Sequence, residues 1–145
     1  MSEMEDIIDF KVIKEDWNLY KLNDGTLLKT KYVLIKVRRE GPDELGSPSY
    51  GLNSSNVIGI ISPKKLLGPP SPAVSPKELP SFIVEDDVEF KAIKEDWNQY
   101  ALDDGTILSI KLVLVKVART SKFDSGGDPL YLVNTQPIVK PSPRK

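Results

Sequence analysis

Two segments of this 145-residue chain, residues 10–39 and 90–119, are near copies of each other. The first reads FKVIKEDWNLYKLNDGTLLKTKYVLIKVRR and the second reads FKAIKEDWNQYALDDGTILSIKLVLVKVAR. They align without a gap, and all but ten of the thirty aligned pairs are identical. A repeat this close predicts that both segments fold in the same way, so that each copy can be interpreted by comparison with the other.

Short turn motifs divide each copy into strand-like runs. Residues 23–25 read NDG and residues 103–105 read DDG, and glycine supplies a positive φ there at no steric cost. The flanking runs are rich in β-branched residues, so each copy predicts a β-hairpin. No stretch shows helical periodicity or helix caps, and the sequence therefore predicts an all-β fold. The predicted strands cover residues 9–14, 17–22, 26–37 and 57–61, with counterparts that include 89–94, 106–117 and 130–139.

Comparison of the copies also predicts which face of a strand points inward. Asn18, Tyr20 and Leu22 recur unchanged 80 residues later, whereas Leu19 and Lys21 are replaced by glutamine and alanine. Successive residues of a strand point to opposite faces. The unchanged set is therefore predicted to lie inside the protein and the changed set in solvent.

The size of each copy predicts that the two copies need each other. A unit of about 55 residues buries a limited apolar fraction and is marginal alone. The centres of the long strands, residues 33–35 and 113–115, are apolar on both faces, which predicts coverage from both sides. We therefore expect two tandem antiparallel β units, barrel-like or open sheets, packed with pseudo-two-fold symmetry. Two independent units joined like beads on a string are the alternative.

A proline-rich segment separates the copies. Residues 63–82 contain six prolines, which remove amide donors and fix φ, so an extended polyproline-like spacer is predicted. A connector is the preferred interpretation, and a proline-rich ligand for an SH3-type domain is the alternative. The predicted organisation is a first β repeat (1–62), the linker (63–82), a second β repeat (83–140) and a basic tail (141–145).

Composition excludes several classes of chemistry. The chain contains no cysteine and no histidine, which excludes disulfides, thiolate nucleophiles, Cys/His zinc sites and imidazole bases. Its formal net charge is −1, so no whole-molecule attraction to nucleic acid or membrane is expected. No apolar run reaches the roughly 18 residues of a membrane span, and the acidic N-terminus differs from a signal peptide. We expect a cytoplasmic protein without a cofactor and without a membrane partner.

Carboxylates recur near the predicted strand ends. Glu15, Asp16 and Asp24 all have counterparts 80 residues later, and converging oxygens could bind a hard cation such as Ca²⁺ or Mg²⁺. The preferred interpretation is turn chemistry, because aspartate hydrogen-bonds to local backbone. No metal site and no catalytic residue is therefore predicted, and a carboxylate- or metal-dependent enzyme is kept as an alternative.

Aromatic and basic residues give a candidate binding surface. Both copies keep a tryptophan on the strand face that otherwise tolerates change, and lysines recur beside it. The pattern permits single-stranded nucleic acid to bind by stacking on aromatic rings in a basic groove. Against this, residues 81–120 contain five basic and eight acidic residues, so solvated strand faces with ion pairs are preferred. The candidate residues are Trp17, Trp97, Tyr20, Tyr100, Lys14 and Lys94.

The sequence thus predicts a non-catalytic binding or scaffold protein. Protein–protein contacts or self-association are the expected activity, because an exposed edge strand can pair with another chain. The loops that differ most between the copies, residues 40–49 and 120–129, are further candidate contact sites.

Overall fold

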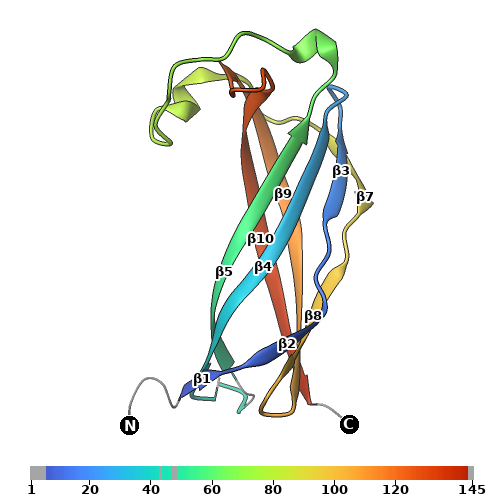
Figure 1. Ribbon diagram of the computed structural model, residues 1–145, viewed down its shortest axis with the longest axis vertical. Helices are drawn as coiled ribbons and strands as arrows, with labels where there is room; N and C mark the ends of the chain where they lie inside the picture. The colour runs from blue at the N-terminus through green and yellow to red at the C-terminus, as the bar shows by residue number, and fades with distance from the viewer. Residues whose placement is uncertain (1–5, 43, 47–48, 144–145) are drawn as a thin grey trace.

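The computed structural model describes residues 6–42, 44–46 and 49–143, and these form an all-β molecule, as predicted (Figure 1). Two antiparallel sheets pack together and do not close into a barrel. The strands of the first sheet are β1 (Ile7–Ile8), β3 (Asn18–Leu22), β4 (Leu27–Glu40), β5 (Ser49–Ile61) and β7 (Phe90–Lys94). The strands of the second are β2 (Phe10–Lys14), β6 (Ile83–Glu85), β8 (Trp97–Leu102), β9 (Thr106–Phe123) and β10 (Pro129–Pro143).

Each sheet contains a strand from the other copy. β2 belongs to the first copy but pairs with β8 of the second, with Phe10 opposite Leu102. Its counterpart β7 pairs with β3 of the first copy, with Phe90 opposite Leu22. Figure 1 shows β7 lying beside β3 and β2 crossing toward β8. Neither copy completes its own sheet, so the two copies form one body rather than independent units.

The hydrophobic core is shared in the same way. Two clusters of buried residues form, and each takes side chains from both copies. In one cluster Phe10 packs edge-on against the Tyr100 ring, and in the other Phe90 packs edge-on against Tyr20. Because each cluster needs both copies, neither copy retains a complete core alone.

The inward faces of the hairpin strands agree with the sequence prediction. Asn18, Tyr20 and Leu22 are buried, as are their counterparts in β8. The prediction for the centre of the long strands is wrong at one position in each copy. Ile35 is 59% exposed and Val115 is 50% exposed, because the register shifts at both places and leaves an extra residue that bulges out of the ladder.

Other predicted strand boundaries need correction. β5 begins at Ser49 rather than at residue 57, and β10 runs from Pro129 to Pro143. β9 continues to Phe123, so part of the second divergent loop is strand. β10 also extends to Pro143, into the segment 141–145 that was predicted to be a basic tail. Of the first divergent loop, residues 43, 47 and 48 lie outside the described part of the chain.

The linker crosses one end of the molecule and contacts the second copy (Figure 1). It contains two single-turn 3-10 helices that the sequence did not predict, η2 (Lys64–Leu66) and η3 (Leu79–Phe82). The Ser71 amide donates to the Phe123 carbonyl at 3.1 Å, and the Phe123 amide donates to Ser71 Oγ at 3.0 Å. Within the described residues, no helix has the length and apolar character that a membrane span requires.

Candidate functional site

The glutamate of the repeated EDWN motif connects the two copies. Glu15 Oε2 accepts a hydrogen bond from the Tyr100 hydroxyl at 2.7 Å and from the Leu34 amide at 3.2 Å. The same arrangement recurs around Glu95, which accepts from Tyr20 at 2.6 Å and from the Leu114 amide at 3.4 Å. In both places the carboxylate holds the backbone beside the bulge of its own copy and a tyrosine of the other.

The asparagine of the motif makes a second set of cross-copy contacts. Asn18 Nδ2 donates to the Leu112 carbonyl at 3.1 Å, and Asn18 Oδ1 accepts from the Asp96 amide at 3.2 Å. Asn98 donates to the Tyr32 carbonyl at 3.2 Å and accepts from the Asp16 amide at 3.4 Å. The motif therefore joins the copies in both directions, and its glutamate and asparagine side chains are occupied by these hydrogen bonds.

The turn aspartates are bound by tyrosines of the opposite copy as well. Asp104 accepts from Tyr50 at 2.8 Å and from Arg39 at 2.9 Å, while Asp24 accepts from Tyr131 at 2.6 Å. Burial raises the pKa of Asp104, but hydrogen bonds from Arg39, Tyr50 and Thr106 outweigh it and lower the pKa to about 2. Burial, followed by the hydrogen bond to Asp24, raises the pKa of Tyr131 to about 12. Within the described residues, no group of three or more acidic side chains is arranged to hold a metal ion.

Four of the six predicted surface residues are engaged within the protein. Tyr20 and Tyr100 are fully buried, so they offer no ring to a ligand. Burial and the nearby glutamate raise the pKa of both hydroxyls. Lys14 lies 3.5 Å from Asp96, and its counterpart Lys94 lies 3.6 Å from Asp16. The structure therefore does not bring the predicted set together as one open surface.

The two tryptophans lie on the outer faces of the sheets. The ammonium groups of Lys29 and Lys31 lie 4.7 and 5.8 Å from the centre of the Trp17 ring. Trp97 is partly exposed and has Lys111 5.9 Å from its ring centre. Such contacts between lysine and an aromatic face stabilise the side chains by about 0.5–1 kcal/mol at exposed sites. They therefore order the lysines on the sheet surface.

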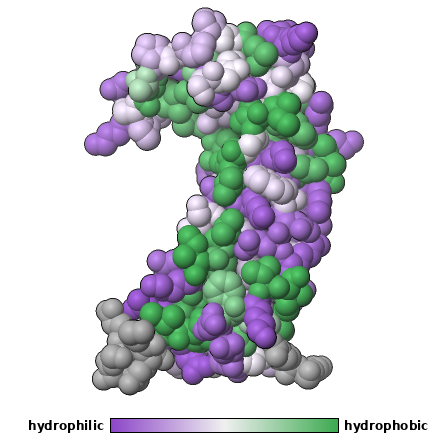
Figure 2. Space-filling view, viewed as in Figure 1, coloured by the Kyte–Doolittle hydropathy of each residue, from purple (hydrophilic) through white to green (hydrophobic). Residues whose placement is uncertain are grey.

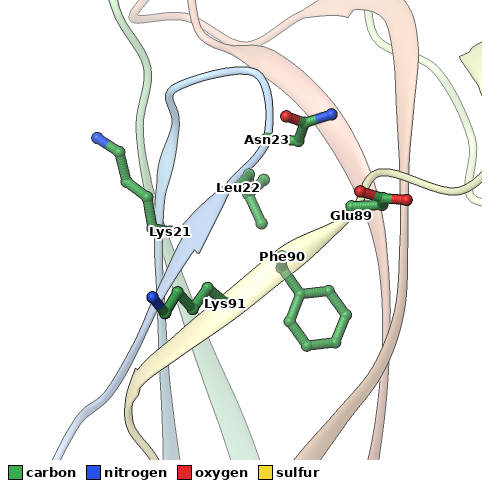
Figure 3. A pocket seen from close by; sticks show the side chains of 6 residues that line it. All are labelled: Lys21, Leu22, Asn23, Glu89, Phe90 and Lys91. Atoms are coloured by element: carbon green, nitrogen blue, oxygen red, sulfur yellow. The ribbon is translucent and has the colours of Figure 1, made fainter.

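The outer face of the first sheet is also basic at the junction of the two copies. Lys21 of β3 lies directly opposite Lys91 of β7, and like charges in this position are destabilising. Figure 3 shows the side chains of both lysines extending to the same side of the paired strands. Both lysines line a hollow of about 360 Å³. At the equivalent place in the second sheet, Lys11 faces Ala101 instead. The rest of the hollow is lined by Leu22, Asn23, Glu89 and Phe90.

The outer edge of β5 has no backbone pairing partner in the described part of the chain, although the Asn56 side chain donates to Thr135 Oγ1 of β10 at 3.3 Å. In the described part of the chain β5 pairs only with β4, and residues 53–58 are exposed although they alternate between the two faces of the strand. Residues 49–61 read SYGLNSSNVIGII and contain no charged residue and no proline. Figure 2 shows apolar surface along the strand region of the molecule. Long, uncharged edge strands of this kind can pair with a strand of another chain.

The matching edge strand, β10, is blocked. Its residues 129–143 contain four prolines and Lys140. Pro137 lies opposite Leu112 and Pro141 opposite Leu108, whereas in β5 the equivalent residues Asn56 and Ile60 lie opposite Tyr32 and Leu28. A proline fits such a ladder only where its nitrogen points away from the neighbouring strand. The prolines thus remove outward donors that β5 retains.

The direction of the β5 amides has independent support. Ser62 has the same parity as Asn56 and Ile60, and its amide donates to Asp128 Oδ1 at 3.0 Å rather than to β4. Amides of alternate residues point to the same side of an antiparallel strand. In the described part of the protein, no acceptor outside β4 receives a hydrogen bond from the amides of residues 56, 58 and 60.

This edge was missed as a specific site by the sequence prediction, which named exposed strand edges only in general. The signal was present in the contrast between residues 49–61, without charge or proline, and residues 129–143, with four prolines. Comparison of the chain with protein-family models, curated proteins and solved structures finds no match.

Proposed function

We propose that the protein is a non-catalytic binding protein that accepts an extended strand of a protein partner along the outer edge of β5. The observation that carries this proposal is the contrast between two equivalent edges, of which β10 is closed by proline and lysine and β5 is open. In strand addition, backbone hydrogen bonds supply affinity and alternate side chains supply selectivity. The matched cross-copy contacts support a pseudo-two-fold arrangement that presents this edge on a rigid body.

A peptide that copies residues 49–62 provides a first probe, because its sequence is already compatible with an antiparallel ladder in this protein. We expect the peptide to slow hydrogen exchange at the amides of residues 56, 58 and 60, measured by NMR on labelled protein. The same peptide should have no such effect on Asn56→Pro/Gly59→Lys/Ile60→Pro, in which β5 carries the β10 residues. Unchanged exchange at β5 in the original protein, at a concentration where the protein is monomeric, would contradict the proposal.

A second candidate function, binding of single-stranded nucleic acid, is favoured by the basic face of the first sheet. Lys21, Lys29, Lys31 and Lys91 have no carboxylate partner within 4 Å in the described part of the chain. The opposed Lys21 and Lys91 would be relieved by a phosphate between them. Trp17 lies beside the other two lysines and offers an aromatic surface.

The second copy supplies a matched control for this candidate, because it has Ala101 and Ser109 where the first has Lys21 and Lys29. Lys21→Ala/Lys29→Ser should weaken binding of a single-stranded oligonucleotide at low salt. It should also reduce the slope of log affinity against log salt by about 0.7 per lysine in contact with phosphate. Equal binding by the original protein and this variant would exclude the face as the site.

A further inference from the structure

The β5 edge has the chemistry expected of a strand that pairs with itself. When two identical strands pair about a two-fold axis, any charged residue near the axis meets its own charge, which is destabilising. Residues 49–61 have no charge to place in that position. Val57 and Ile61 on the outer face are both strongly exposed, and apolar β-branched residues pack well across strands.

From these features we infer that the partner on the β5 edge is a second molecule of this chain. The two molecules pair antiparallel through their β5 strands. This inference rests on the proposed strand addition at β5 and names its occupant. The amides and carbonyls of residues 56, 58 and 60 form hydrogen bonds with the same residues of the second molecule. The five strands of the first sheet in each molecule then form one continuous ten-stranded sheet.

The geometry of the two-fold axis restricts the register. Residues directly opposite each other in an antiparallel pair lie on the same face. Outer-face residues such as Ser55 and Val57 must therefore lie opposite outer-face residues of the second molecule. This leaves registers centred on a single residue of β5, which meets its own counterpart at the axis.

The closed β10 edge explains why the assembly stops at two copies. Pairing of β5 with β10 of another molecule would be head-to-tail and would continue without limit. Pro137 and Pro141 lack the amide donors that this pairing needs. Once β5 is self-paired, neither β5 nor β10 offers an open edge in the described part of the chain, so a dimer results.

Mass measurement by analytical ultracentrifugation tests the inference on the full chain. We expect the original protein to dimerise and Asn56→Pro/Gly59→Lys/Ile60→Pro to dimerise at least about 100-fold more weakly, since proline removes edge donors and lysine adds repulsion. Each substitution copies the residue at the equivalent position of β10, and circular dichroism would check that the variant is folded. A monomeric original protein, or a folded variant that dimerises as strongly, would overturn the inference.

Single cysteines test the same pairing without disturbing the edge, because the chain has no cysteine of its own. Opposite residues in an antiparallel pair have Cα atoms about 4.5–5.5 Å apart, within the range that a disulfide spans. Among Ser54→Cys, Ser55→Cys, Asn56→Cys, Val57→Cys and Ile58→Cys, at least one should cross-link to a covalent dimer on oxidation. Residues 56, 58 and 60 pair with the same residues of the second molecule when Ile58 lies at the axis. Gln136→Cys, at the position of β10 equivalent to Ser55, should remain monomeric under the same conditions, and equal cross-linking there would overturn the inference.

The outcomes separate this inference from the proposed function. If the peptide of residues 49–62 binds at β5 but the protein is monomeric, the proposed strand addition is retained and a second molecule of this chain is excluded as the partner. If the peptide does not bind and the protein is monomeric, both proposals fail.

Discussion

β5 and β10 occupy equivalent places in the two copies but present different edges to solvent. Both pair with the long strand of their own copy, and Tyr50 and Tyr131 stand at matching positions in the two ladders. The edges differ because β10 has proline where β5 has Asn56 and Ile60. By contrast, the residues that join the copies are the same on both sides. The difference shows that the contacts between the copies constrain the sequence strongly, whereas the outer edges are free to take separate roles.

The largest effect should follow from opening the second edge. Pro137→Asn/Lys140→Gly/Pro141→Ile gives β10 the residues of β5, restores two outward amide donors and removes a charge. Each molecule then has two open edges, so we expect assemblies much larger than a dimer, measured by light scattering.

The control for this experiment combines the opened β10 with the closed β5 of Asn56→Pro/Gly59→Lys/Ile60→Pro. One open edge remains in that protein, and particle size should return to that of a small, finite species. No growth in the opened β10 variant would show that the edges of the two strands do not differ in the way described.

A smaller and equal effect is expected at the contacts that the copies share. Asn18→Ala and Asn98→Ala each remove a buried amide that bonds to the backbone of the other copy. The groups left without a partner should lower the free energy of unfolding by about 1–3 kcal/mol in each variant. Chemical denaturation measures both values, and Asn53→Ala, on the exposed part of β5, should change stability by no more than about 0.5 kcal/mol. A large effect in only one of the two buried variants would contradict the matched roles.

Acid should remove a stabilising contribution of the turn residue Asp104. The pKa of Asp104 is lowered from 3.8 to about 2 in the folded protein. Its stabilising contribution is therefore present above the unfolded value and is lost as the pH falls from about 4 toward about 2. Thermal unfolding across this range should show the loss, and Asp104→Asn should weaken the pH dependence. Parallel curves for the two proteins would exclude Asp104 as a source of the acid sensitivity.

The smallest effect is expected where the linker contacts Phe123 at the end of β9. A Cβ atom at Gly68 would lie 2.5 Å from Cζ of Phe123, so Gly68→Ala must move the ring or the linker. We expect faster hydrogen exchange at the Ser71 and Phe123 amides and a global stability change of about 0.5 kcal/mol or less. Gly126→Ala is the control, because its Cβ would meet Asp124 at an ordinary 3.5 Å. Equal exchange in both variants would show that this contact does not hold the linker.

Local pattern was sufficient to predict the strands and most of their faces. The hairpin turns and the alternation of Asn18, Tyr20 and Leu22 report on neighbouring residues of one strand, which is information that a single sequence contains. The exposed Ile35 was not predictable in the same way. Its position depends on a bulge in the pairing of β4 with β5, and apolar character alone does not reveal a register shift.

The candidate surface was predicted less well for a related reason. Tyr20 and Lys14 are residue types that can form a binding surface, but the sequence does not say that Glu95 and Asp96 of the other copy will engage them. The open edge of β5 depends on composition and was visible in the contrast with β10. Its significance required knowing that the two strands hold equivalent positions at the margins of their sheets.

By itself the sequence determined that this protein is built from two matching β hairpins with a defined inner face, because periodicity and turn chemistry act over a few residues. Only the tertiary structure decided that β2 and β7 exchange sheets, that each core draws on both copies, and that Glu15 meets Tyr100. These features depend on pairing between residues far apart in the chain. Two nearly identical strands satisfy the same local pattern in either sheet, so only the packing of the whole chain distinguishes between them.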